Sequence, residues 1–595
     1  MKKNITRKQI AKYILYAIIA ISVLSISFCK NENGEIVIIY TTDIHGNFFP
    51  QDFENDGYDN ASFANLSTFV KEQRDANNNN VLLLDCGNLF SLGVENYYCD
   101  NIDTLSFPMT YSIVKGLDYD FLGVGEIDID NPSMTQPRYR DQELKEKTIC
   151  ANLIDLSSGA PIFTPYKIIN KNGLKIAILG MVSPANNISL PDSRWRSYRT
   201  QDMIECAQRW MPEIKAQNPD VVIGLFHSGM EYDKDGMLPD AYMNPNGGIP
   251  VAMYVPGFDV ILLGGDNNPD IRYMKANDGH MFTVVNIKNQ CYNAGLIRIQ
   301  QTHTDQAINN RIVANIIDLS LYEQDKKYLK KYDNQIKDIY KWLNTEIGYL
   351  ADTLTGYDGI FGPTTYRSLL HLSQFWNTNA DISICNAMIG GDTLLPGPIT
   401  IQNLFHIYPA ESRIMLLDMT GYEVKRYLEY SFANQFKTIS SADEDMLIYK
   451  LDKKGHTLYN LDGNPYLKNS PEMYASATGI RYTVDITKPA GQRITITSMA
   501  DGSAFSQKKN YRVAISSNLA SEGSKMITEG VGWNQETLDM RIVDISDRSM
   551  RDIVKQYIID HDTLHLHTSG HWKIIPEDIW QKQKENIIHN IRPVW

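Results

Sequence analysis

The chain has 595 residues, a net charge of −13, 43% apolar residues and 21% charged residues. This length exceeds what a single hydrophobic core usually spans, so we expect two or more domains. The acidic balance argues against nucleic acid as a partner, because no surplus of Lys and Arg is present to neutralise phosphates. A mean hydropathy of −0.31 excludes a polytopic membrane protein.

The N-terminus has the pattern of an export signal. Several Lys and Arg residues precede an apolar run over 13–28, and Cys29 follows directly. This order resembles a bacterial lipoprotein signal, so we expect residues 1–29 to be the signal and Cys29 to carry the lipid. The protein would then be anchored to a membrane in the cell envelope, facing the periplasm or the cell surface. The alternative is an uncleaved anchor, although about 16 apolar residues are short for a span.

Residues 30–305 have the pattern of a layered α/β domain. Short apolar runs alternate with helical segments, and these runs include EIVIIYTTD, VLLLDCG, LKIAILG, DVVIGLFH and FDVILLGG. The runs are continuously apolar, as expected for strands that are buried on both faces. Most end in Gly, Asp or His before a loop, and loops at strand ends are where layered α/β proteins carry their chemistry.

A connecting helix and a second domain follow. Apolar residues recur at steps of three and four at Leu329, Tyr332, Ile336, Ile339, Leu343 and Ile347. This spacing predicts a linker helix within 306–350. Residues 351–595 then form an α+β domain with strand-like runs such as ADISICN, RIMLLDM and YRVAISSN.

The loop after the first strand contains Asp43 and His45, which can face one ion because alternate side chains of an extended segment point the same way. The segments VLLLDCGNLF, FLGVGEID, FHSG and LLGGDNN follow in that order. This series resembles the 5'-nucleotidase family of metallophosphoesterases, and the segments from NAMIGGD to YRVAISSN resemble its C-terminal domain. The resemblance implies a layered metallophosphoesterase β-sandwich flanked by helices, joined to a second α+β domain of the 5'-nucleotidase type.

The resemblance also implies a mechanism in which two divalent metals share a bridging aspartate and activate a water that attacks phosphorus. Asp43 and His45 match the first metal-binding motif of the family, and His227 matches the histidine of the HSG segment. The metal-ligand positions carried over from the family are Asp43, His45, Asn88, His227, Asp266 and Asn268. We expect them, together with Val124, to converge on one cleft that opens towards Asn386 and Asp392 of the second domain.

Several of these positions depart from the family pattern. Asn88 stands where the family has its bridging aspartate, and a neutral amide is a poor bridge between two dications. Val124 and Gly125 replace the Asn and His of the GNHE motif, so the acid histidine is missing. Asp266 and Asn268 replace two histidines, which favours harder ions over zinc. The surviving set suits one divalent ion better than two.

The nucleotide-binding segment of the second domain departs in parallel. The family's NxGGxR segment corresponds to Asn386, Gly390, Gly391 and Asp392. A carboxylate at Asp392 in place of arginine would repel phosphate. The family's stacking ring in the PF motif aligns with Ala410, so base stacking is weakened as well. A nucleotide or another phosphoester remains the ligand that the resemblance implies.

Three functional readings therefore stay open. The first is a cell-envelope lipoprotein with a degraded two-metal site, which is non-catalytic or strongly impaired and binds a ligand in the interdomain cleft. The second is an active metal-dependent phosphohydrolase, and the third is a one-metal enzyme that uses Asp43, His45, His227 and Asp266. Glu126 and Asp128 are expected to be ordinary loop carboxylates, unless their loop has refolded. Four C-terminal histidines from His561 to His571 are expected to lie in a solvated loop.

Overall fold

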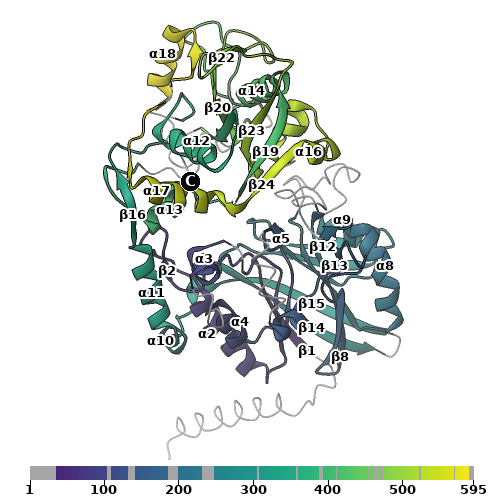
Figure 1. The fold of residues 1–595 in the computed structure, drawn as a ribbon. Coiled ribbons are helices and arrows are strands. Elements are labelled where there is room, and N and C mark those ends of the chain that lie inside the picture. The colour runs from purple at the N-terminus through teal and green to yellow at the C-terminus, as the bar shows by residue number, and fades with distance from the viewer. Residues whose placement is uncertain are drawn as a thin grey trace, which may run out of the picture.

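The structure is a computed structural model, and it describes residues 35–90, 92–102, 109–130, 141–184, 198–230, 247–304, 307–356, 359–386, 393–410, 412–452, 454–459, 463, 465–469, 473–521, 524–568 and 570–588. Cys29, Gly390, Gly391 and Asp392 lie outside these residues. Within the described part of the chain, no helix is long and apolar enough to cross a membrane. The chain forms two lobes, connected along one side by helices α10 (Lys326–Lys331) and α11 (Asp333–Leu343) (Figure 1).

The first lobe contains two large sheets. One sheet has the strand order β15-β14-β1-β4-β5, and the other has the order β12-β13-β11-β10-β8-β7. The bounds are β1 (Glu35–Thr41), β4 (Val81–Asp85), β5 (Phe121–Leu122), β7 (Tyr166–Lys171), β8 (Leu174–Val182), β10 (Val221–His227), β11 (Val260–Gly264), β12 (Asp270–Lys275), β13 (Met281–Asn286), β14 (Asn293–Thr304) and β15 (Ala307–Asp318).

A hydrophobic core lies between these two sheets. It joins Ile36, Ile38 and Leu82 of the first sheet to Ile223 and Leu262 of the second, all of which are fully buried. Further clusters lie on the outer faces, under α2 (Phe63–Ala76) and α4 (Met109–Leu117) on one side and under α8 (Met203–Ala216) and α9 (Gly248–Tyr254) on the other. The predicted β-sandwich flanked by helices is therefore confirmed.

The segment predicted as a linker helix over 306–350 differs from that expectation. β15 pairs with β14 along its whole length and so belongs to the first lobe. Helix α11 buries Ile336, Ile339 and Leu343 of the predicted apolar stripe, but the chain then enters β16 (Glu346–Leu350). The pairing of β16 with β18 (Gly397–Thr400) and β25 (Thr563–Leu564) explains the change, because sheet partners distant in sequence override a local helical period.

The second lobe is built around a five-stranded sheet with the order β20-β17-β23-β19-β24. The remaining bounds in this lobe are α12 (Thr365–Asn377), β17 (Ile382–Asn386), α13 (Ile401–Ile407), β19 (Arg413–Thr420), α14 (Gly421–Gln435), β20 (Ala475–Thr478), β21 (Ile480–Asp485), β22 (Ile494–Met499), β23 (Asn510–Ser516), α16 (Gln535–Arg541), β24 (Ile542–Ser549), α17 (Met550–His561), β26 (Trp572–Ile575) and α18 (Glu577–Ile588). Its core is a separate cluster that includes Ile384, Leu417 and Val513. The predicted α+β character is confirmed.

The two lobes share one hydrophobic cluster rather than meeting across a hydrated gap. Tyr97 of α3 (Val94–Asn101) stacks on Trp342 of α11 at 5.8 Å between ring centroids, and it meets Phe405 of α13 edge-on at 5.5 Å. The side chains of Gln402 and His406 in α13 donate to the backbone oxygen of Glu54, at 3.1 and 2.6 Å. Apolar packing and hydrogen bonds together fix one lobe on the other.

Candidate functional site

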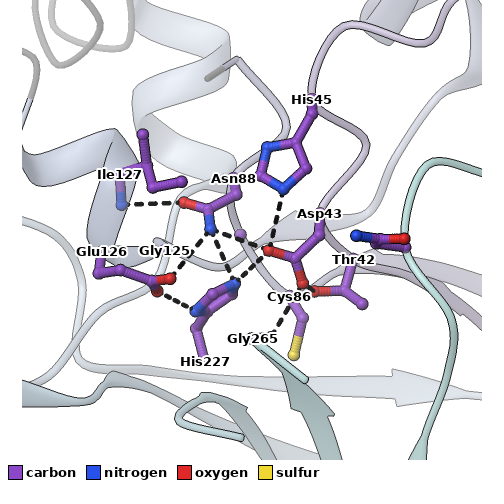
Figure 2. A network of polar contacts seen from close by, with 12 residues as sticks. Thr42, Asp43, His45, Cys86, Asn88, Gly125, Glu126, Ile127, His227 and Gly265 are labelled. Atoms are coloured by element: carbon purple, nitrogen blue, oxygen red, sulfur yellow. Dashed lines mark hydrogen bonds and ion pairs between the residues drawn. The ribbon is translucent and has the colours of Figure 1, made fainter. Parts of the chain in front are cut away.

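Four strand ends of the first lobe form the candidate site. Thr41 at the end of β1 pairs with Asp85 at the end of β4, and His227 at the end of β10 pairs with Gly264 at the end of β11. Because neighbouring parallel strands end at the same edge, the loops that follow them meet there. Asp43, Asn88 and His227 consequently lie together, as Figure 2 shows.

The backbone around these residues is strained. Asp43, His45 and Asn88 have φ angles of 50°, 51° and 57°, in the left-handed region that few residues other than glycine adopt. Asp, Asn and His tolerate this region better than most residues, but each such conformation still costs free energy. Strained residues of this kind cluster at functional sites, which supports a functional origin for this edge of the sandwich.

Asp43 is the centre of the site and is 5% exposed. Its Oδ2 accepts hydrogen bonds from the hydroxyl of Thr42 at 2.7 Å and from the backbone N–H of Gly265 at 2.9 Å. Its Oδ1 lies 2.9 Å from Nε2 of His227 and 3.5 Å from Nε2 of His45. Both carboxylate oxygens are therefore engaged within the protein.

Asn88 is fully buried, and its amide orientation is fixed by its neighbours. The side-chain oxygen accepts the backbone N–H groups of Ile127 and Asp128, at 3.1 and 3.3 Å. The amide nitrogen therefore faces the other way and donates to Asp43 Oδ1 at 2.9 Å. This residue presents hydrogen atoms, and not lone pairs, to the space between Asp43 and His227 (Figure 2).

His227 is completely buried between two carboxylates. Its Nε2 faces Asp43, and its Nδ1 lies 2.5 Å from Oε2 of Glu126 in an ion pair. Burial alone would lower the pKa of His227, but the charges of Asp43 and Glu126 raise it well above its ordinary value. Burial would likewise raise the pKa of Asp43, but His227 and then His45 hold it below its usual range.

Glu126 is thus a site residue that we expected to be an ordinary loop carboxylate. It opens the short helix α5 (Glu126–Asp130), which replaces the predicted loop after β5. Asp128 lies in the same helix, and its Oδ2 accepts the backbone N–H groups of Asn88 and Gly125 at 2.8 and 3.0 Å. A useful signal would have been the two carboxylates at the end of the altered GNHE motif, Glu126 and Asp128, which are two positions apart.

Gly125 and Val124 also have clear structural roles. A Cβ atom at Gly125 would lie 2.1 Å from Oδ1 of Asn88, so this position accepts only glycine while Asn88 keeps its orientation. Val124 packs with Ile129 and Val182 in a small hydrophobic cluster. The expectation that Val124 faces the cleft is therefore wrong, because its side chain turns into that cluster.

Asp266 and Asn268 lie in the loop after β11. Oδ1 of Asp266 accepts both the backbone and the side-chain N–H of Asn268, at 3.0 and 2.8 Å, which closes a local turn. Beside them is a pocket of about 180 Å³, whose lining consists of Glu126, His227, Ser228, Gly229, Met230, Gly265 and Asp266. Asp266 therefore lines the pocket beside the site, while the side chain of Asn268 donates a hydrogen bond within the turn.

The other predicted positions are distributed as follows. Asn386 ends β17 in the second lobe and is 6% exposed, and its backbone oxygen accepts a hydrogen bond from Arg367. His561 bonds the Tyr557 carbonyl through Nδ1, and His565 and His567 are exposed. Within the described residues, no group of three or more His, Cys, Asp or Glu side chains is arranged to hold a metal ion.

Comparison with known proteins agrees with this architecture. The family model for the 5'-nucleotidase C-terminal domain matches residues 346–529. The trifunctional nucleotide phosphoesterase protein YfkN of Bacillus subtilis is 24% identical over 91% of this chain, although the match spans only 39% of YfkN. The protein UshA of Escherichia coli is 22% identical over 79% of this chain and 93% of its own length.

Solved structures show the same two-lobe fold. A protein described as a 5'-nucleotidase from Staphylococcus aureus, in complex with alpha-ketoglutarate, superposes with a TM-score of 0.70 at 15% identity, over 91% of this chain and 99% of its own. A 5'-nucleotidase precursor from Thermus thermophilus gives a TM-score of 0.55 at 16% identity, over 91% and 100%.

The fold of this chain is therefore the two-domain fold of these solved structures, with the strand-end site in its first lobe. The second lobe matches the 5'-nucleotidase C-terminal domain over residues 346–529, and most of the chain is similar to the nucleotide phosphoesterase YfkN and to UshA.

Proposed function

We propose that this protein is a cell-envelope member of the family in which the two-metal hydrolytic site has become a closed polar network, leaving it non-catalytic or strongly impaired. The observation that carries the proposal is the orientation of Asn88, whose amide N–H points at Asp43 across 2.9 Å. A bridge between two metal ions needs an anionic oxygen at this position to offset their repulsion. An amide N–H supplies neither a charge nor a lone pair there.

The donor set does not fit two metal ions. Asp43 and His45 could contribute lone pairs, and so could His227, but only if its Nε2 gives up the contact with Asp43. A single divalent ion would therefore have to displace hydrogen bonds that the network already makes. Because Asn88 is neutral, this chain has no carboxylate at the position where the two-metal hydrolysis of the family needs its bridge.

The proton donor for the leaving group is missing as well. Gly125 carries no side chain. The neighbouring carboxylate of Glu126 is paired with Nδ1 of His227, and that of Asp128 accepts the backbone N–H of Gly125. General acid assistance is worth about 10²- to 10⁴-fold in rate. Its loss, together with the missing bridge, supports a strong reduction in turnover rather than a change of substrate.

A ligand-binding role remains compatible with the fold. The pocket beside Glu126 and Asp266 provides about 180 Å³, which suits part of a small molecule. YfkN is named as a nucleotide phosphoesterase, and this supports a nucleotide or a related phosphoester as the ligand of this chain. In this proposal the protein binds such a ligand in the interdomain cleft without efficient hydrolysis.

The test is an assay of the purified protein with AMP and p-nitrophenyl phosphate, with magnesium, manganese, zinc or cobalt present. We expect no turnover above that of Asp43→Ala, and less than one bound metal ion per chain by elemental analysis. Turnover that disappears in Asp43→Ala would overturn the proposal and favour the active phosphohydrolase. A stoichiometry of one or two metals would then identify the one-metal or the two-metal form of that enzyme.

We also propose that Cys29 carries a lipid that anchors the protein in the cell envelope. The support is the basic and apolar sequence that precedes this cysteine. Several acyl chains together give stable attachment, whereas one chain binds weakly. Cys29→Ala should release the folded protein from the membrane fraction. Continued membrane association of this variant would favour the uncleaved anchor instead.

A further inference from the structure

The pocket beside the strand-end site has an acidic lining. Seven described residues line it, and they include the carboxylates of Glu126 and Asp266 but no Lys or Arg. Asp43 adds a third carboxylate on the far side of the His227 ring (Figure 2). Even if His45 and His227 were both protonated, the carboxylates would remain in excess. The pocket therefore attracts a cation and repels a phosphate group.

The hydrogen-bond donors of the lining are already engaged within the protein. The backbone N–H groups of Ser228 and Gly229 both donate to the carbonyl oxygen of Gly264, at 3.1 and 2.7 Å. The backbone N–H of Gly265 donates to Oδ2 of Asp43 at 2.9 Å. An anion needs free donors to replace its hydration, and these three N–H groups are not available for that purpose.

Acceptors of the lining are available by contrast. Oδ1 of Asp266 closes the turn with Asn268, but its Oδ2 has no hydrogen-bond partner among the described residues. Oε1 of Glu126 makes one long contact, at 3.5 Å from the amide nitrogen of Asn88. The hydroxyl oxygen of Ser228 is buried and makes no hydrogen bond within the described chain. The pocket thus offers acceptors from three side chains to a ligand that carries N–H groups.

The size of the pocket and its remaining walls indicate what carries those N–H groups. The volume of about 180 Å³ is below the range of about 300–1,000 Å³ for whole drug-sized ligands, so the pocket suits a small group. Met230, which is 7% exposed, lines the pocket together with Gly229 and Gly265. A thioether and glycine backbone can contact methylene groups. An ammonium group on a short apolar stem fits these walls.

We propose that this pocket binds an alkylammonium group, with the carboxylates of Glu126 and Asp266 and the hydroxyl of Ser228 as its acceptors. The three N–H groups of an ammonium match these three acceptors, and hydrogen bonds between opposite charges are the strong ones. The ligand is either a free amine or a phosphoester that carries an amine and keeps its phosphate outside the pocket. The inference rests on the proposed function, because two bound metal ions would offset these carboxylates and attract phosphate instead.

The experiment is a calorimetric titration of the full chain at neutral pH, after metal has been removed with EDTA. The probes are ethanolamine, phosphoethanolamine, ethylene glycol and inorganic phosphate, at constant ionic strength. We expect saturable binding of an amine, but no binding of inorganic phosphate or of ethylene glycol, in which a neutral hydroxyl replaces the ammonium. Binding of ethanolamine at least as tight as that of phosphoethanolamine indicates a free amine. Tighter binding of phosphoethanolamine indicates an amine-bearing phosphoester.

Two variants test the assigned acceptors. Asp266→Asn keeps the oxygen that closes the local turn and removes the charge, so the dissociation constant of the amine should rise by roughly tenfold or more. Glu126→Gln should act in the same direction, and it covers the case in which Asp266→Asn does not fold. Asp278→Asn is the matched control. It removes one carboxylate from the exposed turn between β12 and β13 of the same sheet, and it should bind the amine like the wild-type protein.

Three results would overturn the inference: no binding of either amine to the metal-free protein, binding of ethylene glycol or inorganic phosphate as tight as that of the amine, or equal amine affinities in Asp266→Asn and Asp278→Asn. The proposed function fails by a different result. Phosphate binding that appears only with added manganese, and is lost in Asp43→Ala, would show that the site holds metal.

Discussion

The side-chain amide of Asn88 donates to the carboxylate of Asp43 over 2.9 Å, while its oxygen is held by two backbone N–H groups of helix α5. The bond joins the loops that follow β1 and β4, and it keeps Asp43 in place without an ion. The opposite orientation of the Asn88 amide is unfavourable. Its N–H groups would then face the backbone N–H groups of α5, and its oxygen would face the carboxylate oxygen of Asp43.

Asn88→Asp should make the protein dependent on metal for its stability. The change places a second carboxylate beside Asp43 and turns an attractive contact into a repulsive one. We expect a loss of roughly 2–4 kcal/mol in the free energy of unfolding without metal. Manganese or zinc should restore part of that loss in the variant and change the wild-type protein little. Thermal unfolding with and without metal measures both effects, and equal responses in the two proteins would contradict this account.

Gly125→Ala should be destabilising because of Asn88. The added Cβ would lie 2.1 Å from the Asn88 oxygen, which cannot move without losing its two backbone partners. We expect a cost of about 1–3 kcal/mol, and a smaller cost when Asn88 is Ser, so the two changes should couple in a double-mutant cycle. Gly116→Ala is the control, because a Cβ there meets atoms only at 3.9 Å or beyond. Additive effects of the two changes would show that the contact is unimportant.

The stability of the second lobe should fall as the solution becomes acidic, because of His371. Burial and the positive charge of Arg367 lower its pKa to about 3 in the folded protein, while a histidine in the unfolded chain has a pKa near 6.5. Between these values the unfolded chain binds the extra proton, so stability is present above about pH 6.5 and is lost as the pH falls. The slope for one group is about 1.4 kcal/mol per pH unit.

His371→Gln should therefore flatten the dependence of unfolding free energy on pH by one proton. His456→Gln is the matched control, since the His456 side chain is 75% exposed. Denaturant titrations at several pH values between about 4 and 7 give both slopes. A variant slope equal to that of the wild-type protein would show that His371 is not the titrating group.

Tyr97→Ala should uncouple the two lobes. Tyr97 stacks on Trp342, meets Phe405 edge-on and donates its hydroxyl to Asp552 of α17. We expect a loss of about 3–5 kcal/mol and the replacement of one calorimetric transition by two, because the shared core would be interrupted. Tyr422→Ala is the control, as Tyr422 is 53% exposed. A single transition in Tyr97→Ala would mean that the other contacts suffice for coupling.

The sequence by itself determined the framework of this protein. Continuous apolar runs predicted the strands of the first lobe, because strands buried on both faces need apolar residues at every position. The order of the strand-end segments indicated the family and led to Asp43, Asn88 and His227, which the fold brings together. Chain order suffices for this because parallel strands place their final residues at a common edge.

Only the tertiary structure decided how those residues interact. His227 and Asp43 are 184 positions apart, and neither spacing nor composition indicates that Glu126 closes the far side of the imidazole. The amide orientation of Asn88 depends on N–H groups of a short helix that the sequence did not predict. The burial of Arg367 against the ring of Tyr474 likewise depends on a segment about a hundred residues away. Such contacts are set by packing between segments that are far apart in the sequence, so local sequence patterns do not predict them.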